Sequence, residues 1–140
     1  MRKARTTLYA IKDQFSSSDE YQQKYHGAKE GSIEHEQHVT IRDRLRYFHE
    51  AGLLVKKDLV DTDMLFAIVG RGLKQDYQYL KLIVESSRKV HSDPGIYEYF
   101  DYLYARYLQW EAAQQARRAT QPSSEGQLPL RARTLEMTPS

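Results

Sequence analysis

The chain has 140 residues, a net charge of +2 and no cysteine. This length allows one domain with a real core but hardly two. The lack of cysteine excludes disulfides, thiolate catalysis and cysteine-ligated zinc, and it fits the reducing cytoplasm, where we expect the protein to be.

The distribution of charge and of apolar residues excludes further classes. No apolar run approaches the roughly 20 residues of a membrane-spanning helix, and the start, MRKARTTLYA, lacks the apolar segment of a secretory signal. Residues 1–116 carry no net charge, so the basic surplus lies in residues 117–140. Nucleic-acid-binding domains usually carry this surplus on the folded part, which weakens that function here.

Helical periodicity dominates the sequence from its start. A first helix is expected over residues 4–15, with Leu8, Ile11 and Phe15 on one face. Ser18 suits the N-cap of a second helix that ends near residue 27 or 31. A third helix is expected from Ser32, as its cap, to residue 51, where Gly52 would end it.

Glycine and proline divide the rest of the chain. We expect Asp61 to cap a short helix over residues 62–69, with Met64, Leu65 and Ile68 inward, and a bend at residues 70–72. A central helix follows over residues 73–91, and a sixth helix begins at Pro94 and ends near residue 118. Residues 119–140 are rich in proline and serine, which predicts a flexible tail, expected to be basic.

The predicted fold is therefore all-α: a compact bundle of five to six helices over residues 1–118, followed by a disordered C-terminal tail over residues 119–140.

The segment SIEHEQHVTIRDRLRYFHEAG, residues 32–52, holds three of the five histidines. Its HEQH falls one residue short of the zinc-protease motif HExxH, whose histidines must be four apart to share a helix face. His35 and His38 are three apart, and His49 lies three turns away, so no third ligand is within reach. We predict no metal site, and we expect His38 to pair with Glu34 at the head of the core stripe.

A second face of this helix could bind an anion or an acidic partner. Its residues are His35, Arg42, Arg46 and His49. The alternative is an ordinary surface helix with the ion pairs Asp43–Arg46 and Arg46–Glu50.

The start of the sixth helix is unusually rich in tyrosine, with five of the chain's eleven tyrosines within residues 97–107. Tyrosine offers a large contact area with a polar end and is enriched at interfaces. The candidate partner-binding residues are Tyr97, Tyr99, Tyr102, Tyr104 and Arg106. The alternative is that these tyrosines only cover the edges of the core.

One segment resembles a known family. Residues 47–64, YFHEAGLLVKKDLVDTDM, are similar to the central segment of a bacterial domain-of-unknown-function family (the 4760 type), and the likeness covers about residues 8–108. Members often begin with a membrane-spanning helix, so this chain looks like a soluble variant without one. The family has no established catalytic residues, and the resemblance implies none here.

The sequence thus favours a non-enzymatic protein-interaction module without a cofactor, an accessory or regulatory protein that acts through its tyrosine-rich helix on another protein or on itself. One alternative is a phage or mobile-element protein that inhibits or senses a host complex. Another is weak nucleic-acid binding through Arg42, Arg44, Arg46 and the tail.

Overall fold

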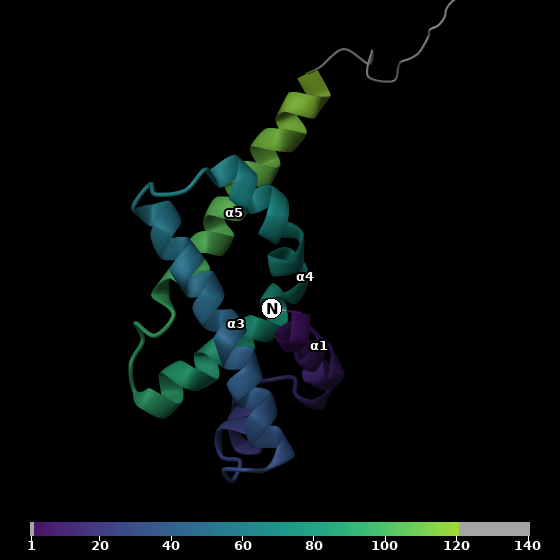
Figure 1. Ribbon diagram of the computed structural model, residues 1–140, viewed down its shortest axis with the longest axis vertical. Helices are drawn as coiled ribbons and strands as arrows, with labels where there is room; N and C mark the ends of the chain where they lie inside the picture. The colour runs from purple at the N-terminus through teal and green to yellow at the C-terminus, as the bar shows by residue number, and fades with distance from the viewer. Residues whose placement is uncertain (1, 121–140) are drawn as a thin grey trace, which may run out of the picture. The chain divides into compact units, whose positions relative to one another are not determined.

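The computed structural model of the protein describes residues 2–120, and all regular structure in this range is helical (Figure 1). The all-α prediction is therefore confirmed. Residues up to Tyr107 form one compact unit, and a second unit begins at Leu108. The predicted tail lies outside the described residues, except for its first two, which belong to the last helix.

The N-terminal part is a series of short helical segments. They are α1 (Arg2–Ile11), a 3-10 turn (Lys12–Gln14), α2 (Ser18–Tyr21) and a π-helical turn (Gln22–His26). Leu8, Ile11 and Phe15 are buried, as their spacing predicted. The cap of α2 is Ser17 and not Ser18, because the Ser17 hydroxyl accepts from the Glu20 amide.

The third helix is longer than predicted. α3 spans Ile33–Lys56, and Ser32 caps it as expected by accepting from the His35 amide. Gly52 does not end the helix: it lies inside it, where a Cβ atom would collide with the carbonyl oxygen of Tyr99. Gly52 therefore allows two segments of the chain to approach closely, and it does not end the helix.

α4 spans Thr62–His91 without a break. Asp61, just before it, is the N-cap as predicted, because its side chain accepts from the Met64 amide. Figure 1 shows α4 as one ribbon that changes direction along its length. The prediction of two separate helices, over residues 62–69 and 73–91, was wrong, because residues 70–72 lie inside one continuous helix. A Cβ atom at Gly70 would collide with the Tyr107 ring, so this glycine too marks a packing contact.

The first turns of α4 face differently from the prediction. Met64 and Ile68 were expected inward but are 62% and 74% exposed. In the continuous helix, Phe66, Gly70 and Leu73 form the buried stripe, and the 100° step per residue puts Met64 and Ile68 on the opposite side.

α5 spans Glu98–Thr120 and begins four residues later than predicted. Asp93 accepts a hydrogen bond from the Gly95 amide, so the chain turns here before it becomes helical. Tyr97, just before the helix, has a φ of 56°, which only a minority of non-glycine residues adopt. Phe100, Leu103 and Tyr107 then enter the core of the first unit.

Candidate functional site: an arginine pocket at α1, α3 and α4

A buried carboxylate joins three helices. Asp76 of α4 is completely buried, and its Oδ2 atom lies 3.2 Å from Arg44 Nη2 of α3 and 3.5 Å from Arg5 Nε of α1. Arg5 also donates hydrogen bonds to the Tyr9 hydroxyl and to the side chain of Gln75.

This cluster carries more positive than negative charge. Two guanidinium groups share one carboxylate, and arginine stays protonated in proteins. Burial lowers the pKa of Arg44, and the Asp76 carboxylate offsets only part of this effect. The Nε atoms of Arg5 and Arg44 and the Oδ1 atom of Asp76 are all buried without a hydrogen-bond partner. Such atoms are few in folded proteins, and each calls for an explanation.

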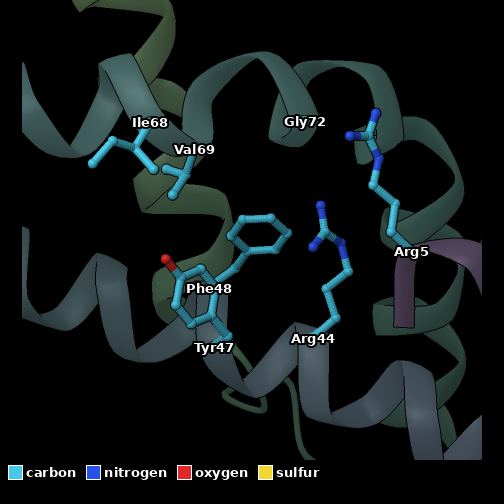
Figure 2. A pocket seen from close by; sticks show the side chains of 7 residues that line it. All are labelled: Arg5, Arg44, Tyr47, Phe48, Ile68, Val69 and Gly72. Carbon is cyan, nitrogen blue, oxygen red and sulfur yellow. The ribbon is translucent and has the colours of Figure 1, made fainter. Parts of the chain in front are cut away.

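A pocket of about 390 Å³ opens beside the two arginines. Its lining residues are Arg5, Arg44, Tyr47, Phe48, Ile68, Val69 and Gly72. Figure 2 shows the two guanidinium groups on one side of the pocket and the four apolar and aromatic side chains on the other. The pocket therefore has a cationic end and an apolar end.

Local packing holds the Arg44 guanidinium at the edge of this pocket. Its carbon lies 4.7 Å from the centre of the Phe48 ring, one turn along α3. On the other side, a Cβ atom at Gly72 would lie only 3.3 Å from Arg44 Nη2. The Phe48 ring and the helix backbone at Gly72 thus flank the Arg44 guanidinium.

Our reading of the sequence did not single out this site, although a signal for it exists. Asp76 lies between Leu73 and Leu80 on the buried stripe of its helix, and Arg44 lies between Ile41 and Phe48 on another. A charged residue at a core position on each of two helices indicates a buried ion pair.

A second polar cluster surrounds His38. Its Nδ1 atom lies 2.8 Å from the Tyr21 hydroxyl, and its ring centre lies 4.1 Å from that of His26. The hydrogen bond that holds His38 thus comes from Tyr21 and not from Glu34, as the sequence predicted. Tyr21 belongs to α2, whereas His38 belongs to α3. The spacing of residues within α3 therefore could not predict this contact.

His26 in turn contacts two serines of α4. Its Nδ1 atom lies 2.6 Å from Ser86 Oγ, and its Nε2 atom lies 3.3 Å from Ser87 Oγ. A serine beside a histidine is the first requirement of a nucleophilic site, but Ser86 is completely buried. This arrangement holds the π-helical turn against α4.

Burial keeps both histidines neutral. It lowers the pKa of His38 to about 3, with help from the positive charge that His26 would carry, and that of His26 to about 4. Within residues 2–120, no group of three histidine or carboxylate side chains is placed to hold a metal ion.

The predicted anion-binding face on α3 is only partly a surface. Arg42 and Arg46 are exposed, and Arg46 lies 3.4 Å from Asp43, which confirms that predicted pair. His49 is half-buried and accepts from the Tyr99 amide. His35 is also half-buried, at the first turn of α3. Arg44, which we had grouped with Arg42 and Arg46 for nucleic-acid binding, is buried at Asp76 and cannot reach a phosphate backbone.

The tyrosine-rich segment makes many contacts within its own unit. Tyr104 stacks on Tyr77 of α4 with ring centres 3.7 Å apart. Tyr102 accepts from Arg106, and the Lys56 ammonium lies 5.2 Å from its ring centre. Tyr97 and Tyr99 lie beside the His49 ring. All four tyrosines are half-buried, so they join the start of α5 to α3 and α4.

Comparison with known proteins agrees with the resemblance noted in the sequence. Neither a curated protein nor a solved structure matches the chain. None of the helices within residues 2–120 combines the length and the apolar character needed to cross a membrane. A family model with the description "Domain of unknown function (DUF4760)" matches residues 1–107, which include all of the first compact unit. The chain therefore belongs to this family of domains of unknown function.

Proposed function

We propose that this protein is a non-enzymatic interaction module that associates with a second copy of itself through the start of α4. The observation that carries the proposal is a run of exposed apolar side chains. Leu59, Met64 and Ile68 are 69%, 62% and 74% exposed, all within ten residues. We call these three residues the α4 strip.

The α4 strip has the form of a helix-packing surface. Met64 and Ile68 are four residues apart, so they lie one above the other on α4 and form a ridge of the kind that packs into the groove of another helix. Large apolar side chains that are grouped on a surface often mark a binding site. The tyrosines at the start of α5 are a weaker candidate, because their rings already contact neighbours in the first unit.

Charge complementarity favours a second copy as the occupant. Asp61 lies just before the ridge of Met64 and Ile68, and the exposed Arg71 lies just after it. If two α4 helices pair antiparallel about a twofold axis, Asp61 of each copy approaches Arg71 of the other. Such self-complementarity is what a twofold interface requires, and the charges would set its orientation.

Light scattering coupled to size-exclusion chromatography tests this proposal over a wide range of protein concentration. The expected molar mass rises from monomer to dimer for the wild-type chain. The Ile68→Glu variant should stay monomeric, because a charge in the ridge cannot be buried without a partner.

Val90→Glu is the matched control, since Val90 is also an exposed apolar residue of α4 but lies far from the strip. It should dimerise like the wild-type chain. A wild-type chain that is monomeric at every concentration, or an Ile68→Glu variant that still dimerises, would contradict the proposal.

A further inference from the structure

We propose that the pocket beside Arg5 and Arg44 binds a carboxylate that is attached to a small apolar organic group. The carboxylate would lie at the cationic end of the pocket, and the apolar group would lie against Tyr47, Phe48, Ile68 and Val69.

The unpartnered donors are the first reason. Arg44 is only 7% exposed, yet its buried Nε atom has no hydrogen-bond partner, and the buried Nε atom of Arg5 has only a long contact of 3.5 Å with Asp76. Leaving such a donor without a partner costs about 1–3 kcal/mol. A carboxylate accepts several hydrogen bonds, and it pairs with guanidinium groups more strongly than a neutral acceptor does.

The charge balance is the second reason. Arg5 and Arg44 together face only Asp76 as a counter-charge. One ligand carboxylate would make the cluster neutral. No acidic side chain lines the pocket itself, and Asp76, the carboxylate beside it, is already paired with both arginines.

The shape of the pocket indicates what the carboxylate is attached to. A volume of about 390 Å³ is at the lower end of the range for small-molecule sites. An inorganic anion at the arginine end would leave the apolar end filled with water. An aromatic or aliphatic group of a few carbon atoms would instead displace this water and gain from the contact.

Nuclear magnetic resonance of the arginine Nε–H groups tests the proposal directly. Phenylacetate is the probe, and phenylacetamide is its neutral analogue of nearly the same shape. Phenylacetate should shift the Nε–H signals of Arg5 and Arg44 and the ring signals of Phe48 in a saturable manner. Phenylacetamide should not shift them. Equal shifts with phenylacetate and phenylacetamide would overturn the proposal.

Arg5→Gln is the variant that tests the site, because the Arg5 side chain is 38% exposed and its loss leaves the Arg44–Asp76 pair in place. It should weaken phenylacetate binding roughly tenfold. The matched control is Arg46→Gln, which removes an exposed arginine from the predicted α3 face and should leave binding unchanged. An equal loss in both variants would show only a general charge effect and overturn the assignment.

Two sources could supply such a carboxylate: a free organic acid or the C-terminus of a peptide. A short acetylated peptide that ends in leucine, with a free or an amidated C-terminus, separates them. Binding of the free-acid peptide alone would assign the site to chain ends, whereas binding of phenylacetate alone would assign it to small acids. Failure of both would overturn the proposal.

This inference does not depend on self-association, although Ile68 belongs to both surfaces. Arg5→Gln should leave the monomer–dimer equilibrium unchanged, so the two proposals can fail separately.

Discussion

At the scale of single residues, the most consequential side chain is Asp76. It is a fully buried carboxylate whose Oδ2 atom holds arginines from two other helices. A buried ion pair adds little net stability compared with an apolar replacement, but breaking one by removing a single partner is costly. The cluster therefore acts mainly to specify how α1, α3 and α4 fit together.

Replacing Asp76 with asparagine should lower the free energy of unfolding by about 3–5 kcal/mol, because it leaves the buried guanidinium group of Arg44 and the partly exposed one of Arg5 without a counter-charge. Urea denaturation measures this change. The control, Asp43→Asn, breaks an exposed pair with Arg46 and should cost less than about 1 kcal/mol. Similar losses of the free energy of unfolding in the two variants would mean that the Asp76 cluster is effectively solvated.

The buried His38 and the half-buried His26 predict a pH dependence of stability. The pKa values of His26 and His38 are lowered to about 4 and about 3 in the folded state, whereas in the unfolded chain they are near 6.5. Between these values the unfolded chain binds more protons than the folded protein. Stability is therefore complete above about pH 6.5 and falls as the pH decreases, by about 1.4 kcal/mol per pH unit for each histidine.

Urea denaturation at several pH values between 6.5 and 5 measures this slope. The slope should be clearly smaller in His38→Gln, whose amide can still bond to Tyr21. It should be unchanged in Leu59→Ala, because Leu59 is exposed and carries no titratable group. A slope that His38→Gln does not alter would show that other groups cause the acid sensitivity.

At the scale of the helices, glycines decide how the long elements meet. Gly52 and Gly70 lie inside α3 and α4, where glycine lowers helix stability by about 0.5–1 kcal/mol relative to alanine. Both positions allow residues from the start of α5 to approach a helix backbone, Tyr99 at one and Tyr107 at the other. The close fit of α5 depends on these two missing side chains.

Gly70→Ala should therefore lower the free energy of unfolding by about 1–3 kcal/mol, despite the better helix propensity of alanine, because its Cβ atom would collide with the Tyr107 ring. Gly72→Ala is the matched control two residues away in the same helix. Its Cβ atom would meet the ends of two arginine side chains, Arg44 Nη2 at 3.3 Å and Arg5 Nη1 at 3.7 Å, and no ring or backbone atom within those distances. It should be close to neutral, and equal destabilisation of both variants would contradict the packing role of Gly70.

At the scale of the whole molecule, the first compact unit has a core to which α1 and the later helices all contribute. Its fully buried side chains include Leu8 of α1, Leu45 of α3, Leu80 of α4 and Phe100 of α5. The short N-terminal helix is thus part of the core and not an addition to its surface.

Leu8→Ala should lower the free energy of unfolding by about 2–5 kcal/mol, the usual cost of a cavity at a fully buried leucine. Circular dichroism in the far and near ultraviolet should report a single coincident transition. Leu59→Ala, at a residue 69% exposed, should change stability by no more than about 0.5 kcal/mol. A small effect of Leu8→Ala, or separate transitions, would show that α1 folds apart from the core.

The sequence by itself determined the helical class and several local features. Ser32 and Asp61 cap α3 and α4 as predicted, because a cap depends on residues only three positions apart. Leu8, Ile11 and Phe15 are buried as predicted, because the helical period places them on one apolar face. These outcomes depend on interactions within one or two helical turns, which spacing alone describes.

Only the tertiary structure decided what the glycines, the charged core residues and the histidines do. From the sequence, Gly52 and Gly70 were predicted to mark a helix end and a bend. In the structure they lie against Tyr99 and Tyr107. Asp76 meets Arg44 from 32 positions away, and His38 meets Tyr21 from 17 positions away. The physical reason is common to all: each contact joins residues far apart in the chain, so it depends on how helices pack and not on any local periodicity. The arginine pocket is one result of that packing.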